Sequence, residues 1–493
     1  MTLPLPLQNI VCINCKLRKK KCDKTRPSCG YCTTKKLDCQ YPSGETKYLS
    51  PQPRPLVAID SPIIHSSWLL SSALSDALLS EPTNADSTIY LQVLRIIRST
   101  GLVIDDVAAR YFRGTHSLLP IVSRPRFQDT LTHLGHPPSA GFSVLLLSIC
   151  LVTYHPEMSE SASPPDAASI YLAAKTLFTQ VQASFPLSLD LIQAGVIIAT
   201  YEFASGRVHD AFASIGTSAR LGLAARLHLT RPVPGPDGDV NPHTEEEANT
   251  WWGILISERT IFCEILDFQQ PLATKVPNEP FLPKDPAGLD YRAGLDTHGT
   301  PSSTSASTIS SASTVSSSPS ISSPGSGSDA GGFATLAQAV LFLDQLFQTL
   351  EITDLDAKLN RLDGLDHTIR TFLAVAMDQS QGRWGPFCVI NSIAFRGLFI
   401  LHCHIIEQVQ YVTQCKRKSP AEWVASSHAV LHTLLRMTGD VVNPHTQIPL
   451  AYHDAVPLTT VYLVRFVLDY VRRYRVENVG WDFRNTPEVP AMG

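Results

Sequence analysis

The sequence predicts a mostly α-helical protein in which a small cysteine-rich domain with two short helices precedes a large all-helical domain. Three observations support this fold class. Six cysteines are concentrated near the start of the chain, long apolar stretches at helical spacing follow them, and a serine-rich tract interrupts these stretches late in the sequence. At 493 residues the chain is long enough to bury a sizeable core.

The six N-terminal cysteines form two copies of the spacing Cys-x2-Cys-x6-Cys, offset by seventeen residues. A tetrahedral zinc ion needs four ligands, so two ions need eight coordination positions. Six thiolates fill eight positions only when two of them bridge both ions. The repeat therefore predicts one cluster of two Zn²⁺ ions. Its ligands would be Cys12, Cys15, Cys22, Cys29, Cys32 and Cys39.

A disulfide framework is the alternative, and it would be the first choice in a small secreted domain. The sequence shows no sign of export, because residues 1–11 have no basic start and are interrupted by Pro4 and Pro6. The longest strongly apolar run, about Phe142 to Tyr154, is shorter than the ~20 residues that span a bilayer. We therefore expect reduced, zinc-binding thiols in a protein that does not cross a membrane.

The basic residues are concentrated at the N-terminal end. The formal net charge of the chain is -4, yet residues 1–50 contain ten lysines and arginines against three acids. Most of these cations lie between the second and third cysteines or just after the third. Part of the charge offsets the thiolates, and the excess is available to phosphates, whose neutralisation makes binding depend steeply on salt. The same run could also serve nuclear import.

The cysteine pattern resembles the zinc binuclear-cluster (Zn2Cys6) domain of fungal transcription factors over residues 12–39. The resemblance implies that Cys12 and Cys29 are the bridging ligands and that Pro27 lies in the loop between the two halves. It further implies that a short helix starting near Cys15 enters the major groove of double-stranded DNA. There Lys19 would read the guanines of a CGG-like triplet. The other residues that would contact DNA are Arg18 beside it, Lys20 in the same run, and Lys21 and Lys24 at phosphates.

Proline, glycine and serine mark the region after the cluster as a linker. A helix over Trp68 to Leu79 is stopped by Pro82 before two full heptads, whereas a convincing coiled coil needs three to four. Monomeric binding and a homodimer formed without an evident coiled coil both stay open. The predicted organisation is an N-terminal tail (1–11), the cluster (12–39), a linker (40–65), helical domain (66–298), a serine-rich insertion (299–332), the C-terminal helical part of that domain (333–476) and a tail (477–493).

Several segments resemble the fungal-specific transcription factor domain, the middle homology region of such regulators. They include the Tyr111-Phe112 pair, the run from Arg124 to Phe127, the acidic segment Glu245 to Glu247 with Trp251-Trp252, and Glu258-Arg259. Ala248 to Thr250 depart from the pattern, because basic residues are usual there. The resemblance implies an all-helical regulatory domain.

Helical periodicity predicts which residues of this domain face its core. Phe212, Ile215, Ala219, Leu223 and Leu227 recur at the spacing of a buried stripe. For Trp251 and Trp252, packing in the core explains the aromatic pair more simply than a ligand-stacking site.

The serine-rich insertion has 15 serines among the 28 residues from 301 to 328. Such a composition buries too little apolar surface to fold, so we expect a disordered insertion. A passive linker is the preferred interpretation, and phosphorylation at Ser318 or Ser323 is the alternative. Helical patterning returns after it at Phe333–Leu350, Phe372–Met377, Ile390–Val412, Ala421–Thr438 and Leu458–Tyr474.

Catalytic motifs are missing from the sequence. It contains no phosphate-binding glycine loop and no G-x-S-x-G turn. His402 and His404 lie two apart on an expected helix, where their side chains diverge by about 200° and cannot share an ion. Four later cysteines sit singly in apolar or helical surroundings and are expected to fill the core; they are Cys150, Cys263, Cys388 and Cys415. We therefore expect no enzyme.

The two resemblances imply a nuclear, zinc-dependent, sequence-specific transcription factor for RNA polymerase II. We expect an activator of metabolic or secondary-metabolite biosynthetic genes whose partners are CGG-like DNA and the transcription machinery or its coactivators. A repressor of the same architecture is one alternative. A zinc- or redox-responsive interaction protein without specific DNA binding is the other.

Overall fold

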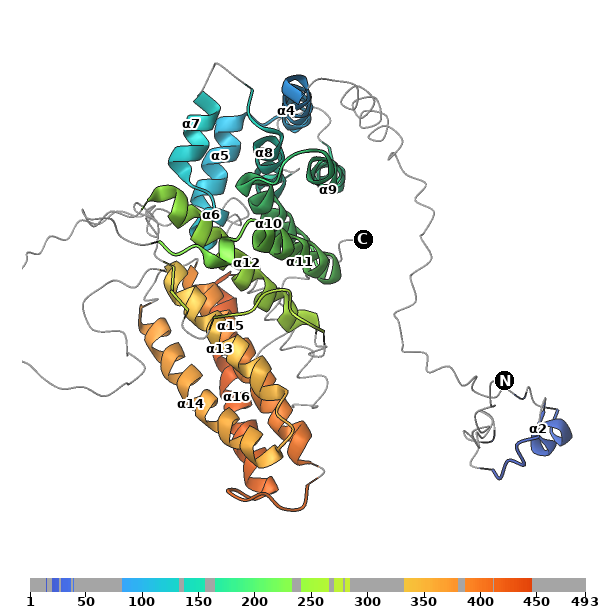
Figure 1. Ribbon diagram of the computed structural model, residues 1–493. Coiled ribbons are helices and arrows are strands. Elements are labelled where there is room, and N and C mark those ends of the chain that lie inside the picture. The colour runs from blue at the N-terminus through green and yellow to red at the C-terminus, as the bar shows by residue number, and fades with distance from the viewer. Residues whose placement is uncertain are drawn as a thin grey trace, which may run out of the picture. The chain divides into compact units, whose positions relative to one another are not determined.

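The fold is shown by a computed structural model of the chain (Figure 1). Two units are distinguished by their internal contacts, Met1–Ile64 and His65–Gly493, and each is described by itself. The structure describes residues 15, 20–25, 28–36, 39, 82–132, 137–155, 165–232, 241–265, 270–277, 280–283, 332–379, 386–410 and 412–445.

Several predictions fall outside these residues. They concern Cys12, Arg18, Lys19 and Pro27 in the cluster, the linker, the helix over 68–79, the serine-rich insertion up to residue 331, the helix over 458–474 and the C-terminal tail.

The N-terminal unit is a small cysteine-centred fold. Its helix α2 (Gly30–Thr34) begins after Cys29, which accepts the backbone N–H of Cys32 on its sulfur. The helix ends at Lys35, whose N–H donates to the carbonyl oxygen of Tyr31 at 3.1 Å. Cys15 is also helical, and its carbonyl accepts the N–H of Lys20 at 3.0 Å. The predicted order of a cysteine cluster followed by a large helical domain is confirmed, and no strand occurs among the described residues.

The first part of the helical domain is built around two helices, α8 (Ala140–Thr153) and α10 (Leu189–Ala204), which pack on each other. Thirteen of the fourteen residues of α8 are buried, as expected for a helix that is apolar on every side. Ser139 and Ser188 set the starts of these two helices, because each hydroxyl accepts a backbone N–H of the first turn.

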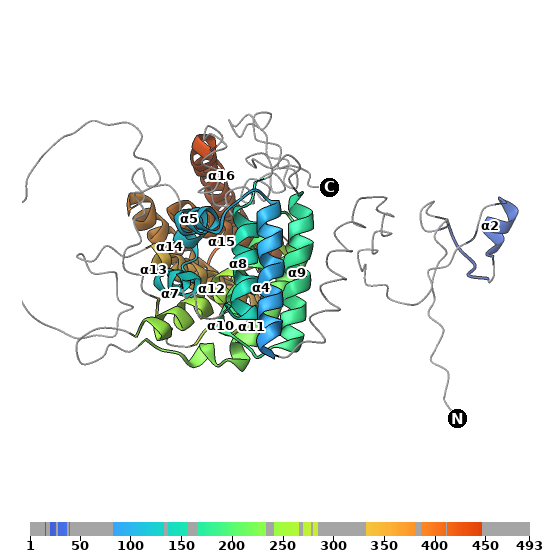
Figure 2. The ribbon, with the colours of Figure 1, turned by 90° about the horizontal axis from the view of Figure 1, so that it is seen from above.

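Other helices cover this central pair (Figures 1 and 2). Against α8 pack α4, α5 and α9, and against α10 pack α9, α11 and α12. Their bounds, with those of the short helices in the same part, are α4 (Pro82–Ser99), α5 (Ile104–Arg113), α6 (Thr115–Leu118), α7 (Arg124–Thr132), α9 (Ala167–Ser184), α11 (Val208–Ala224), η2 (Leu227–Leu229) and α12 (Pro242–Ile265).

The buried face of α11 agrees in part with the predicted stripe. Ile215, Ala219 and, beyond the helix, Leu227 are buried, whereas Leu223 is 37% exposed. The same face also contains Ala211, Ser218 and Gly222. Small side chains occupy this face because the neighbouring helices approach closely. A Cβ on Gly222 would lie 3.1 Å from the side chain of Ile254 on α12. Apolar periodicity misses such a face because serine and glycine do not count as apolar.

The second part of the domain is a set of four long helices, α13 (Gly332–Leu350), α14 (Leu355–Gln379), α15 (Pro386–Val409) and α16 (Pro420–His445). In Figure 1 they lie alongside one another below the first part, with α15 in contact with the other three. By length and composition α13 and α15 could each cross a membrane, but most of each apolar window is buried inside the domain. The same property is expected of core helices in a helical bundle.

Residues from the segments that resemble the fungal-specific transcription factor domain contact one another and join the helices. Arg126 donates from Nε to Glu246 and from Nη1 to Asp190, each at 2.7 Å, although 120 residues separate Arg126 from Glu246 in the chain. Arg259 donates to Asp344 on α13 at 2.8 Å, and both are buried. Charged residues of these segments therefore clamp α7, α10 and α12 together, and they clamp α12 to α13.

The tryptophan pair of α12 belongs to the core, as predicted. Trp251 and Trp252 are each 6% exposed. The indole N–H of Trp252 donates to the carbonyl oxygen of Phe281 at 2.9 Å. The pair therefore fixes α12 within the core and holds the segment that follows it in the chain.

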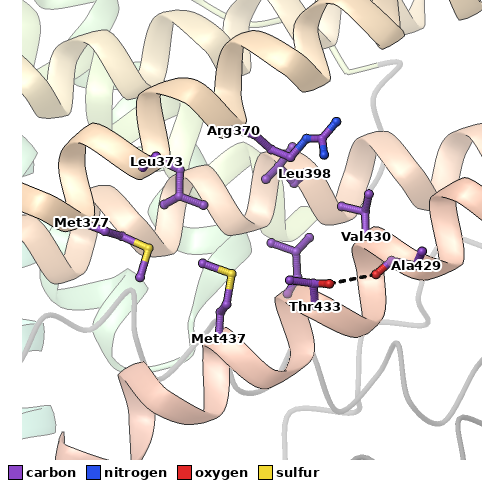
Figure 3. A pocket seen from close by; sticks show the side chains of 10 residues that line it. Arg370, Leu373, Met377, Leu398, Ala429, Val430, Thr433 and Met437 are labelled. Carbon is purple, nitrogen blue, oxygen red and sulfur yellow. Dashed lines mark hydrogen bonds between the residues drawn. The ribbon is translucent and has the colours of Figure 1, made fainter.

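A pocket of about 500 Å³ lies where α14, α15 and α16 meet. Met377 and Met437 face it from α14 and α16, and Leu398 lines it from α15 (Figure 3). Arg370, its one charged lining residue, pairs with Asp366 one turn earlier on α14. The lining is otherwise almost entirely apolar.

Candidate metal centre and nucleic-acid interface

Three of the six predicted ligands converge in the N-terminal unit. Cys15, Cys29 and Cys32 are fully buried, and their sulfurs lie within 4.8 Å of one another. The Sγ atoms of Cys15 and Cys29 are 3.6 Å apart. Two sulfurs on one tetrahedral zinc, with bonds of ~2.3 Å, would be about 3.8 Å apart, whereas a disulfide bond is ~2.05 Å long. The spacing therefore fits thiolates that share a cation.

Cys29 occupies the centre of this arrangement. Its sulfur also lies within 4.8 Å of the sulfur of Cys22 and a carboxylate oxygen of Asp23. Cys29 therefore belongs to two groups of ligand atoms, one with Cys15 and Cys32 and one with Cys22 and Asp23. Its own backbone N–H donates to the sulfur of Cys39 at 3.2 Å. Five of the six predicted ligands thus gather around one another, and Cys12 lies outside the described residues.

Among its described residues, the N-terminal unit has almost no apolar core besides the cysteines. Of the described residues, only Tyr31 adds a hydrophobic side chain to the cysteine cluster, and it is half-buried. A domain with so little buried apolar surface depends on metal for its folding free energy. The donor set and its packing therefore fit a binuclear zinc cluster.

The described part of the predicted DNA-binding run is exposed. Lys20, Lys21 and Lys24 all face solvent, as do Lys35 and Lys36 of the second half. Arg18 and Lys19, the residues assigned to base reading, lie outside the described residues. The three described lysines are thus accessible to phosphates, and base reading by the other two stays a prediction.

Sequence reasoning missed the role of Asp23. Its carboxylate accepts the backbone N–H of Gly30, at 2.9 Å to Oδ2 and 3.1 Å to Oδ1, and that of Thr25 at 3.3 Å. These bonds, the one from Gly30 above all, hold the pKa of Asp23 below its ordinary value. An aspartate side chain often accepts the backbone N–H two residues further on, and this turn signal could have suggested the bond from Thr25.

His402 and His404 of α15 have different surroundings in the helical domain. His402 is buried, and its ring nitrogens contact Ser427 Oγ at 3.1 Å and Asp366 Oδ1 at 3.0 Å. Burial and the nearby Lys358 lower the pKa of His404 to about 4. Ser427, His402 and Asp366 are each no more than 6% exposed, so the contacts serve to join α14, α15 and α16.

The cysteines of the helical domain whose side chains the structure describes lie in the core or at its edge. Burial raises the pKa of the Cys150 and Cys263 thiols to about 12, which leaves them protonated and unreactive. Cys415 is half-buried, and burial raises its pKa as well. The side chain of Cys388 lies outside the described residues. The buried thiols of Cys150 and Cys263 therefore act as small apolar groups.

Comparison with known proteins matches two family models. The fungal Zn(2)-Cys(6) binuclear cluster domain matches residues 10–48, and the fungal specific transcription factor domain matches residues 108–265. The first range contains every predicted zinc ligand. The second contains the clamp residues Arg126, Glu246 and Arg259.

Among curated proteins, the chain is similar to transcription factor BOA15 of Botryotinia fuckeliana, with 27% identity over 145 residues that cover 29% of this chain and 78% of the relative. It is 44% identical over 41 residues to regulator of drug sensitivity 1 of Saccharomyces cerevisiae, 8% of this chain and 5% of the relative. A transcription factor of Aspergillus terreus is 23% identical over 320 residues, 47% of this chain and 51% of the relative. The chain thus spans about half or less of the latter two relatives. No solved structure matches.

Proposed function

We propose that this chain, a fungal Zn(2)-Cys(6) transcription factor, activates a specific set of metabolic or secondary-metabolite biosynthetic genes by binding CGG-like sites. It is a nuclear DNA-binding protein that binds two zinc ions and is not an enzyme. The observation that carries the proposal is the difference in charge between the two halves of the cluster. The first half has five basic residues between its second and third cysteines, and the second half has two.

The zinc ions are held by the six cysteines of the repeat in this proposal, with Cys12 and Cys29 as bridges. The membership of Cys29 in two groups of ligand atoms supports its bridging role. When bound, the two ions supply the cross-links that fold the N-terminal unit. The chain's own contribution is to bury Cys15, Cys29 and Cys32 and to leave the described lysines exposed.

DNA reading belongs to the first half of the cluster. Lys19, with Arg18 beside it, donates to the O6 and N7 atoms of guanine in the major groove. Lys20, Lys21 and Lys24 bind phosphates, which agrees with the exposure of all three. The phosphate contacts contribute affinity that falls with salt, and the base contacts contribute preference for the site.

The helical domain, with the proposed bounds 66–298 and 333–476, controls activity and meets coactivators or the transcription machinery. Its single continuous core, joined by the Arg259–Asp344 contact, supports the assignment of both segments to one domain. Pairing of two chains through this domain would place two clusters on DNA without a coiled coil.

DNA binding by the zinc-loaded full chain tests the proposal. Affinity is measured on a duplex with a CGG triplet and on a duplex of the same composition with the triplet scrambled. We expect clear preference for the CGG duplex, and equal affinity for both would favour the interaction protein that lacks specific DNA binding. A reporter gene behind the bound site then separates activation from repression, because an activator raises its transcription when overexpressed.

A further inference from the structure

We propose that Asp23 is a positioning residue for DNA binding, because its carboxylate holds the backbone of Lys24 in the conformation that presents the Lys24 ammonium group to a phosphate. The inference rests on the proposed function, in which the first half of the cluster binds DNA. Asp23 and Lys24 directly follow Cys22, the last cysteine of that half. Their geometry is therefore part of the DNA-binding half.

The backbone of Lys24 is left-handed, with φ of 63°. A residue with a Cβ rarely adopts this conformation unless its surroundings hold it there. The N–H of Thr25 donates to Oδ1 of Asp23 at 3.3 Å, so the carboxylate connects the residue before Lys24 to the residue after it. This Asx-type turn closes around Lys24 and stabilises its backbone.

A second contact anchors the carboxylate to the other half of the cluster. Both oxygens of Asp23 accept the N–H of Gly30, the first residue of α2. A Cβ at residue 30 would lie 2.6 Å from Oδ2 of Asp23, so the close approach requires glycine. The turn at Lys24 is therefore fixed relative to the second half by a link that does not pass through metal.

Lys36 provides the matched comparison within the same unit. Its backbone is also left-handed, with φ of 52°. Lys36 follows α2, and its N–H donates to the carbonyl of Thr33, as is usual after a helix C-terminus. Residues 20–25 are not helical, so Lys24 does not follow a helix C-terminus as Lys36 does. The turn made by the Asp23 carboxylate supports its conformation instead.

Two substitutions separate the effect of the Lys24 backbone conformation from the effect of the Asp23 charge. Asp23→Ala removes the turn and also an acidic group, and the loss of that charge alone would strengthen binding to DNA. Gly30→Ala displaces the carboxylate and changes no charge. Both should release Lys24 from its phosphate, although their electrostatic effects differ. Asp23→Asn keeps an oxygen that accepts both N–H groups and should preserve the turn.

The experiment measures the affinity of the zinc-loaded full chain for the CGG duplex by fluorescence anisotropy over a series of salt concentrations. Zinc content is determined for each variant. We expect Lys24→Gln to lower the slope of log affinity against log salt by about 1 and to weaken binding about threefold to tenfold. Asp23→Ala and Gly30→Ala should lower the slope equally, and Asp23→Ala combined with Lys24→Gln should lower it no further. Asp23→Asn and Lys36→Gln should keep the slope of the unsubstituted chain.

The outcomes distinguish this inference from the proposed function. An unsubstituted chain without preference for CGG would contradict both. If it prefers CGG but Asp23→Ala and Gly30→Ala keep its salt slope, or if the effects of Asp23→Ala and Lys24→Gln add, the positioning role is wrong. Loss of zinc from Gly30→Ala would show that the contact supports the metal cluster rather than Lys24, and would overturn the inference as well.

Discussion

The cluster and the helical domain are held together by different means. In the cluster, the four other described cysteines gather around Cys29, and Tyr31 is the one other described hydrophobic residue packed with them. In the helical domain, one core runs from α4 to α16, and buried charge pairs join its helices. The smaller unit therefore depends on metal binding for its stability, whereas the larger one depends on apolar burial and on a few precise polar contacts.

The substitution with the largest expected effect unfolds the cluster and leaves the helical domain folded. Cys12→Ser removes a proposed bridge, so both zinc ions should be released and the N-terminal unit should unfold. Zinc content by mass spectrometry should fall from two ions to none, and DNA binding should disappear. The far-UV circular dichroism of the chain should change little, because the helical domain contains no predicted zinc ligand. A chain that still holds two ions tightly would refute the bridging role of Cys12.

The next effect concerns the helical domain alone. Asp344→Ala leaves the buried Arg259 without its contact on α13, and we expect the free energy of unfolding to fall by about 3 kcal/mol. Denaturant unfolding followed by circular dichroism measures the change. Asp210→Ala is the control, because its pair with Arg207 is exposed and should contribute no more than ~1 kcal/mol. Similar losses of unfolding free energy in both variants would show that the buried Arg259–Asp344 pair contributes no more than an exposed pair.

A smaller effect tests the recognition of DNA by the cluster. Lys19→Ala should weaken binding to the CGG duplex by about 1–3 kcal/mol, because a bidentate contact to guanine is lost. Binding to the scrambled duplex should weaken much less. Lys35→Ala serves as the control, since the second half is not assigned to base reading. Equal weakening on both duplexes would contradict the role of Lys19 in reading the triplet.

The substitution with the smallest expected effect removes the N-terminal cap of one helix in the large domain. Ser139→Ala removes the hydroxyl that caps α8, and unfolding should become easier by about 1 kcal/mol. The cluster should keep its zinc and its affinity for DNA, because the two units are stabilised separately. The same denaturant titration measures the effect, with Ser139→Asp as the variant that restores a cap. A loss of zinc in Ser139→Ala would show that the units are coupled.

The sequence alone determined the cysteine repeat, the excess of positive charge in its first half and the helical character of the large domain. Each of these depends on spacing and composition, which are local properties of the chain. The tertiary structure decided which residues meet. The helix period did not reveal that α11 packs through Ala211, Ser218 and Gly222, because the face is set by close approach of neighbouring helices. Nor did it reveal the bond from Gly30 to Asp23, because hydrogen bonds between segments depend on how the chain folds back on itself.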